Sequence, residues 1–539
     1  MKNKIASGAL IMLLTGSITF FSSCEGFMDD FLDTTEGSQT EVNYFETENR
    51  VDRGIGAIYS QVGLLYGTNM ESGAFATGPL CRIWSLPADE LTLDRPAMLE
   101  FEAFENIQND HGNIWSYWCV LYTIIGRANF MLDILADPSN YSQDISSEHI
   151  DNCKGEALFM RAFCDMRLFY NFHKAPNQNT RIKSVEGNMV GPSEGFELLD
   201  QAIKDLILAE DLLPESWDSR NKGRVFKNSA RGLLTKAYVL RACYANKYNG
   251  NAQEDYKNAI AAFERISQVS TIEGVEFSDN FNYETENNQE SLYEYQASFN
   301  IDQDNPWLNG NQGSNSAQIG AMWFQYRNDS YNYMINDATF GPTKKFLDMF
   351  DRRDPRWEET FRDRVGDESW NKFDGYQFYK YNKRDGALDP TYNTMSRNNP
   401  RILRLADVKL LAAEAYLQTG QEPKAREQVN DIRRRARSNV SDIPADYTSA
   451  ITMQEIMDER VFELGGEDDI RITDLKRWHV AGYIDLAEWA KNPAEKWGYP
   501  YNNDVSFKFD PNRDLLFPIP TAEMNANPLM QNSGNNPGY

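Results

Sequence analysis

The sequence lacks the residue patterns on which most catalytic and cofactor sites depend. It holds only four histidines, and no two of them stand at the spacing of a metal site. It has no Gly-x-Ser-x-Gly, no phosphate-cradling glycine loop and no dinucleotide fingerprint. We therefore predict a protein with no metal, no cofactor and no catalytic residue. A glycoside hydrolase stays open as a less favoured alternative, because 80 acidic residues bring carboxylates together by chance.

Cysteine is also scarce. Besides Cys24 there are five, an odd number whose spacings match no dense disulfide scaffold. Three of them fall in apolar helical patterns, which favours buried free thiols, although one bridge stays open. These three are Cys119, Cys164 and Cys243, and the other two are Cys81 and Cys153. No disulfide framework is expected to hold the fold.

The N-terminus has the pattern of a bacterial lipoprotein leader. A short basic start precedes the apolar or small-residue run Ile5–Phe21, which is shorter than the roughly 20 apolar residues of a membrane span. Two serines and Cys24 follow, although Phe21 stands where an aliphatic residue is usual. We predict a signal peptide over residues 1–23, acylation at Cys24 and a polar tether over residues 24–50. An ordinary secreted protein is the alternative.

Positive charge is in short supply. Lys and Arg number 54 against 80 Asp and Glu, a net charge of -26 that becomes -28 if Lys2 and Lys4 leave with the leader. Such a surface repels nucleic acid and anionic lipid and favours neutral or cationic partners. With 41% hydrophobic residues, the chain can nevertheless bury a large core.

Helical periodicity dominates most of the chain. Asp137-Pro138 and Pro214 mark helix ends, and Asn251 with Glu254 forms a cap-like pair. The predicted helices span residues 107–135, 148–172, 196–213, 227–244, 252–269, 402–419, 423–436 and 452–464.

Residues 270–400 have a different character. Glycine, asparagine, aspartate and aromatics crowd there, with strand-like pieces such as Ser291–Gln296 and Tyr376–Tyr381. Loops this long are usually functional or disordered, and the aromatic content argues against disorder. We predict one domain over residues 51–539. Its helical scaffold covers about 51–270 and 400–480, and its loop-rich ligand region covers about 270–400.

Short motifs follow one another in a specific order along the mature chain. They include Glu156–Phe163, Asp354-Pro355-Arg356, Arg401-Ile402-Leu403-Arg404, Glu459-Arg460, Asp474-Leu475, Arg477-Trp478 and the final Pro537-Gly538-Tyr539. In this order they resemble the RagB/SusD family of nutrient-uptake proteins over nearly the whole mature chain. Local departures occur at Cys164, Asp165 and Val461, where the family commonly has aromatics or an arginine.

The resemblance implies a mostly α-helical SusD-like fold. Four tetratricopeptide-like helix pairs would form the scaffold, and long irregular loops with a few short strands would carry a shallow ligand site. It further implies a non-catalytic lipoprotein tethered outside the outer membrane, placed as a lid on a SusC-like, TonB-dependent transporter. Glycan is the expected cargo. Oligopeptide is the alternative cargo, since a net charge of -28 would also suit cationic peptides.

Loop aromatics are the candidate ligand contacts. An exposed indole offers an apolar face to a sugar ring, and neighbouring amides can meet its hydroxyls. No family motif sets these positions. The candidates are Trp84, Trp307, Asn309, Trp323, Tyr326, Tyr331 and Tyr333. By contrast, Trp115, Trp118 and Tyr122 recur at helical spacing and are expected in the core.

Four charged residues near the C-terminus could serve structure or catalysis. Glu459, Arg460, Arg471 and Asp474 are expected to form one buried ion network that ties the C-terminal helices together. Their spacing would also suit a pair of catalytic carboxylates, and we favour the network.

Overall fold

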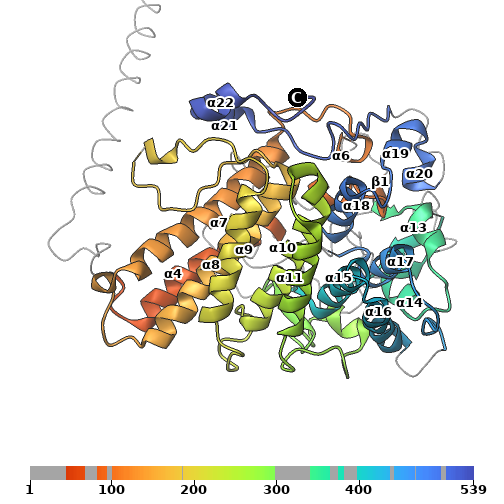
Figure 1. Cartoon of the computed structure of the whole chain (residues 1–539), viewed down its shortest axis with the longest axis horizontal. Helices are drawn as coiled ribbons and strands as arrows, with labels where there is room; N and C mark the ends of the chain where they lie inside the picture. Colours follow the sequence, from red (N-terminus) through yellow and green to blue (C-terminus); the bar gives the residue numbers. More distant parts are fainter. Residues whose placement is uncertain are drawn as a thin grey trace, which may run out of the picture.

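The computed structural model describes residues 44–66, 82–93, 100–184, 186–297, 340–364, 374–381, 397–437, 442–467, 469–498 and 506–539. Over these ranges the fold is mostly α-helical with a few short strands, which confirms the predicted fold class. Figure 1 shows the long helices lying side by side as one continuous layer.

Six long helices form the first part of the scaffold, and each packs against the next along the chain. Such stepwise packing is compatible with tetratricopeptide-like pairs, which stay a prediction. One of them, Gly112–Ala136, is long and apolar enough to cross a membrane, but the helices before and after it in the series both pack against it. The six are α4 (Glu48–Tyr66), α7 (Gly112–Ala136), α8 (Ser147–Asn171), α9 (Glu197–Leu212), α10 (Lys227–Tyr248) and α11 (Ala252–Glu264).

A second group of helices closes the scaffold on the side of α10 and α11. It contains α15 (Leu405–Gln418), α16 (Glu422–Arg437), α17 (Met453–Leu464) and α18 (Ile470–Ala481). Helix α15 packs against α10, α11, α16 and α17, and its residues from Leu405 to Ala415 are buried on nearly every side. This burial is what its almost uniformly apolar sequence predicts.

Short strands and short helices complete the fold. Within the described residues the strands form antiparallel pairs: β1 (Leu91–Leu93) with β3 (Phe340–Pro342), β2 (Ser291–Glu294) with β6 (Arg401–Arg404), and β4 (Phe361–Asp363) with β5 (Tyr376–Phe378). The short helices are α5 (Arg82–Ser85), α6 (Glu100–Ala103), α13 (Lys344–Met349), α14 (Arg356–Thr360), α19 (Ala487–Lys491), α20 (Ala494–Trp497), α21 (Thr521–Ala526) and α22 (Pro528–Ser533). The 3₁₀ turns are η2 (Pro138–Asn140), η3 (Glu186–Asn188) and η4 (Phe277–Phe281).

Capping residues in the sequence correctly predicted several helix ends. The Asn251 side chain accepts from the backbone N–H of Glu254, and Thr452 with Glu455 forms a reciprocal capping box. Gly420 has φ +77°, the left-handed conformation that glycine adopts without strain after a helix.

Several predicted boundaries are wrong. The helix expected from residue 107 begins at Gly112, and the helix expected to end at residue 244 continues to Tyr248. The helix expected from residue 402 begins at Leu405, because Arg401–Arg404 pairs with β2 instead. A run buried on both faces looks alike in a strand and a helix, so apolar content alone could not separate them. The helix expected to residue 269 ends at Glu264.

The folded scaffold begins before residue 50. Phe45 is buried and forms a parallel bridge with Tyr141, and α4 already starts at Glu48. The expected end of the tether therefore falls inside the first helix of the series.

The interior holds an extended network of charges between α14, α16, α17 and the pair β2–β6. Each member contacts an opposite charge within 3.2 Å, and the five carboxylates balance the five cations. All except Arg433 are buried. We call this group the ten-charge network. Its members are Glu290, Asp354, Glu459, Glu463 and Glu467 with Arg356, Lys380, Arg404, Arg433 and Arg435.

The four residues expected to share one ion network are divided among three groups. Arg460 pairs with Asp474 at 2.7 Å, whereas Glu459 belongs to the ten-charge network and Arg471 pairs with Asp89 at 2.7 Å. Successive residues of a helix point in directions about 100° apart, so Glu459 and Arg460 meet different neighbours. The group around Arg460 consists of Lys236, Asp407, Glu414, Arg460, Asp474 and Arg477.

Candidate functional site

Most of the expected ligand contacts lie outside the described residues. Trp307, Asn309, Trp323, Tyr326, Tyr331 and Tyr333 fall within residues 298–339, and Cys24 precedes residue 44. Trp84 is the one expected contact that the structure describes. The candidate site is therefore built from the scaffold residues at which these segments begin and end.

Trp84 is buried, in contrast to its expected role as an exposed platform. It lies in α5, is 2% exposed, and has the rings of Tyr66 and Tyr117 at centroid distances of 6.0 and 5.8 Å. The single turn of α5 ends at Ser85, shortly before Pro87, and packs inward. An enclosed indole has no face to offer a sugar ring, so the prediction for Trp84 as a ligand contact is wrong.

Trp84 instead belongs to a set of rings whose other members lie next to two of these segments in the chain. Tyr66 is the last residue before residues 67–81, and Tyr295 lies shortly before residue 298. Their rings stack at 6.1 Å, and Trp84 meets Tyr66 edge-on. Gly63 permits this contact, since a Cβ there would come 2.8 Å from the Tyr295 hydroxyl oxygen. We call Tyr66, Trp84 and Tyr295 the aromatic floor. Sequence reasoning missed both tyrosines.

A buried ion pair joins the aromatic floor to the helices below it. Arg167 of α8 contacts Asp469 at 3.0 Å and donates to the Tyr66 hydroxyl at 3.0 Å, and its guanidinium lies 5.5 Å from the Trp84 ring centre. Tyr170 donates its hydroxyl to the same Asp469 carboxylate, and burial raises the pKa of Tyr170 well above its ordinary value. The floor is thus fixed to α8 and to the start of α18.

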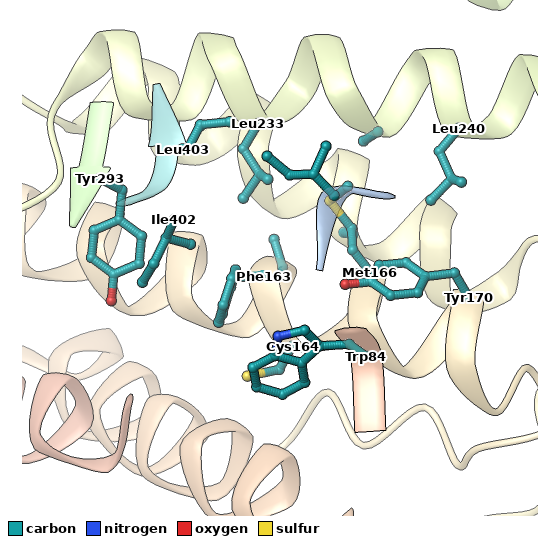
Figure 2. Packing of buried hydrophobic residues seen from close by; sticks show 14 of the residues in the cluster. Trp84, Phe163, Cys164, Met166, Tyr170, Leu233, Leu240, Tyr293, Ile402 and Leu403 are labelled. Carbon is teal, nitrogen blue, oxygen red and sulfur yellow. The ribbon is translucent and has the colours of Figure 1, made fainter. Parts of the chain in front are cut away.

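The core under this ion pair is closely packed. Figure 2 shows Met166 and Tyr170 of α8 lying toward Leu233 and Leu240 of α10. Tyr293 donates its hydroxyl to the Met160 sulfur at 3.6 Å. Close packing of this kind holds side chains in single positions, which suits a rigid base for loops.

The pair β1–β3 borders the far end of the segment 298–339 and the start of a further segment. Residue 339 leads into β3, and residue 94 follows β1. Lys496 donates to the carbonyls of Leu86 and Glu102 at 3.0 and 2.6 Å, and the Glu102 carboxylate accepts from the Leu93 N–H at 3.1 Å. Burial lowers the pKa of Lys496 to about 7 and raises the pKa of Glu102 to about 7. Two buried ionisable side chains therefore brace this edge of the candidate site.

Among the open clefts elsewhere on the scaffold are two of different size. The larger, about 660 Å³, lies between residues 263–276 and the helices α15 and α16. Its Lys409 and Arg434 both pair with Asp431, at 2.8 and 2.5 Å. Ion pairs within the wall already satisfy these charges, so this cleft shows no preference for a charged ligand.

The smaller cleft, about 260 Å³, contains an aromatic residue that sequence reasoning missed. Half-buried Trp217 lines it together with Asn287 and Asn288, and the Arg224 guanidinium lies 4.5 Å from the indole centre. Trp217 follows Pro214 in a polar stretch. The criterion that nominated Trp84, a tryptophan in a proline-bounded loop, would have found it.

The described carboxyls do not form an evident catalytic pair. Burial raises the pKa of Glu90 to about 7 and of Glu286 to about 8, but Glu90 is buried and accepts from the Gly466 N–H at 2.9 Å. Glu294, which neighbours Glu286, pairs with Arg401 at 3.2 Å. A glycosidase needs an acid and a second carboxylate on opposite sides of an accessible bond.

Comparison with known families explains this arrangement of helices and loops. A family model described as starch-binding and associating with the outer membrane matches residues 30–239, and the model of the SusD family matches residues 366–539. The chain belongs to the SusD family. The two matches lie on either side of residues 298–339, which hold most of the expected ligand contacts.

Several relatives cover most of this SusD-family chain. A SusD-like protein P25 of Formosa agariphila is 23% identical over 81% of this chain and 82% of its own length. A SusD-like protein of Bacteroides ovatus is 22% identical over 92% and 84%.

Solved structures support the same fold. A laminarin-binding SusD-like protein superposes with a TM-score of 0.70 at 20% identity, covering 92% of this chain and 100% of its own. Surface glycan-binding protein A of Bacteroides fluxus gives 0.71 at 22%, with the same two coverages.

Proposed function

We propose that this SusD-family chain is a cell-surface glycan-binding lipoprotein that delivers its cargo to a SusC-like, TonB-dependent transporter in the outer membrane. Residues 1–23 would be removed, Cys24 acylated, and the following residues would tether the body to the membrane. Family membership supports this role, as do the names of two similar proteins, a laminarin-binding SusD-like protein and a surface glycan-binding protein A. Strong net negative charge agrees with a neutral ligand and argues against nucleic acid.

The observation that carries the proposal is the aromatic floor with its buried supports. Its Tyr295 lies in the chain shortly before the segment that contains Trp307, Trp323 and Asn309, so that segment follows a closely packed part of the scaffold. Tryptophan and amide side chains on a rigid base can bind a sugar through its apolar face and its hydroxyls, with little loss of loop entropy. Tethering would keep the captured chain concentrated at the transporter mouth.

Affinity electrophoresis tests binding and catalysis together. Residues 25–539 are run in native gels that contain one polysaccharide each, and reducing ends are assayed in the same samples. We expect retardation by at least one glycan without new reducing ends. New reducing ends would establish a hydrolase. Binding of oligopeptides but of no glycan would show that the cargo is peptide.

Variants locate the site. The double variant W307A/W323A should abolish retardation while the melting temperature stays unchanged. Tyr447→Ala is the matched control, because Tyr447 is a half-buried aromatic that stacks on Arg433 at 4.2 Å. Equal loss of binding in both variants would contradict the proposed site.

Anchoring and delivery are tested in cells. Cys24→Ala should release the protein from the membrane fraction and remove labelled acyl chains. Deletion of the SusC-like transporter should stop uptake although the purified chain still binds. Uptake that continues unchanged would refute the delivery role.

A further inference from the structure

We propose that Asp52, His149 and Cys153 form a binding site for a divalent cation of the zinc class, at the junction of α4 and α8. This inference does not depend on the glycan-binding role. His149 and Cys153 are one helical turn apart on α8, so their side chains share a face. Asp52 reaches the same point from the first turns of α4. The histidine spacings in the sequence could not show this, because the partners are a cysteine and a residue of another helix.

The donor atoms stand at the separations of a tetrahedral site. Zinc bonds of about 2.3 Å to sulfur and about 2.0–2.2 Å to nitrogen or oxygen place neighbouring ligand atoms about 3.4–3.6 Å apart. Cys153 Sγ lies 3.7 Å from His149 Nε2, which lies 3.4 Å from Asp52 Oδ1. All three donors are within 4.8 Å of one another. Rotation of the Asp52 carboxylate would close the remaining edge.

The cluster is closed at one end and open at the other. Cys153 is fully buried, whereas the side chains of His149 and Asp52 are 17% and 38% exposed. A cation can therefore enter from solvent past the imidazole and carboxylate and reach the sulfur. Three protein donors leave a fourth tetrahedral position on the solvent side for water.

Charge near the cluster favours a cation even though an arginine borders it. Arg224 approaches Asp52 at 3.1 Å and the Cys153 sulfur at 3.9 Å. However, it also makes contacts of 2.9 and 2.5 Å with the buried Glu156 carboxylate, which neutralises it. The negative charge of Asp52 and of a Cys153 thiolate would then balance a divalent cation. Arg224 would remain as a hydrogen-bond donor to the metal-bound sulfur.

The donor set selects the class of cation. Calcium and magnesium prefer oxygen ligands, whereas a thiolate, an imidazole and a carboxylate together suit zinc. A cation here would fasten the start of α4, which follows the proposed tether, to the first turns of α8. The competing interpretation is a purely hydrogen-bonded cluster that holds the same two helices together.

Metal titration separates the two interpretations. Residues 25–539, the mature chain without its acylated cysteine, are stripped with chelator and titrated with Zn²⁺ against a chromophoric competitor. We expect one tight equivalent, a melting temperature that rises with Zn²⁺, and a thiolate-to-metal absorption band with Co²⁺. Cys153→Ser should remove the Co²⁺ band. His149→Gln should weaken Zn²⁺ binding at least about 10-fold, the lower end of the effect of altering even indirect ligands.

Cys119→Ser is the matched control, because Cys119 is a free, half-buried thiol on α7. It should keep both the Zn²⁺ affinity and the Co²⁺ band. The proposal is overturned if the unmodified chain retains no Zn²⁺, if its Co²⁺ complex lacks the thiolate band, or if Cys153→Ser binds as tightly as the parent. The first two readouts need no variant, so a poorly folding Cys153→Ser would not protect the proposal.

Discussion

Glu463→Gln should be among the most damaging single substitutions that leave side-chain volume unchanged. Glu463 lies at the centre of the ten-charge network. One carboxylate oxygen accepts from Arg404 at 2.6 Å and from Arg435, and the other accepts from Arg356 at 3.2 Å. The amide keeps the shape but leaves one positive charge of the network unbalanced in a buried site.

The size of the effect follows from burial. Removing one partner of a buried ion pair costs about 3–5 kcal/mol, against about 0–1 kcal/mol for an exposed pair. An unfolding entropy of about 2.1 cal/mol/K per residue amounts to about 1 kcal/mol/K for a chain of 539 residues. The melting temperature should therefore fall by about 3–5 °C.

Lowering the pH should reduce the difference in melting temperature between the parent and Glu463→Gln. Burial alone would raise the pKa of Glu463, but Arg435, Arg404 and Arg356 hold it below the ordinary value of 4.5. A carboxyl with a lowered folded-state pKa stabilises the fold above its unfolded-state pKa and loses that contribution as the pH falls. The gap in melting temperature should thus be full at pH 7 and shrink as the pH falls below about 4.5.

Differential scanning calorimetry of residues 25–539 measures the effect. The matched control is Glu488→Gln, because Glu488 forms an exposed pair with Lys491 at 2.6 Å. Adding Arg435→Met to the Glu463 variant restores charge balance and should recover part of the loss. The reasoning is refuted if Glu463→Gln melts within about 1 °C of the control, or if the second substitution lowers the melting temperature further by its full separate cost.

Three further outcomes follow from burial. Trp84→Phe should keep glycan binding, while Trp84→Ala should cost about 3–5 kcal/mol of stability; lost binding in a stable Phe variant would return Trp84 to the ligand site. Glu102→Gln should gain stability over the parent as the pH rises, by about 3 kcal/mol in total, because burial raises the folded-state pKa of Glu102 from 4.5 to about 7. Melting temperatures of the two proteins that change in parallel from pH 5 to 8 would contradict this. Cys164 and Cys243 should resist alkylation until the chain unfolds, and rapid labelling in the native state would show that they are accessible.

The helical scaffold was predictable because its signals are local. The apolar stripe of residues 196–213 became α9, and the caps at Asn251 and Thr452 lie where their side chains indicated. The start of α15 was missed because Arg401–Arg404 pairs with a strand more than 100 residues earlier, and no local pattern reports such a pairing. The expected C-terminal ion network was also missed, because its members form ion pairs with residues far away in the sequence.

The candidate site was less predictable for a related reason. Exposure of an aromatic side chain depends on what the rest of the chain places over it. Trp84 has the polar, proline-bounded setting of a surface loop, yet Tyr66 and Tyr117 enclose it from two distant helices. The tyrosines of the aromatic floor gave no signal of their own, because Tyr66 ends an ordinary helix and Tyr295 directly follows an ordinary strand.

The motifs that identified the family meet in the charge networks rather than in a ligand site. Arg356, Arg404 and Glu459, each from a different motif, belong to the ten-charge network, and Asp474 and Arg477 belong to the second. Buried charges depend on every partner being present, so each motif requires the others to fold. A surface loop has no such requirement. This difference explains why the order of motifs predicts the fold but not the cargo.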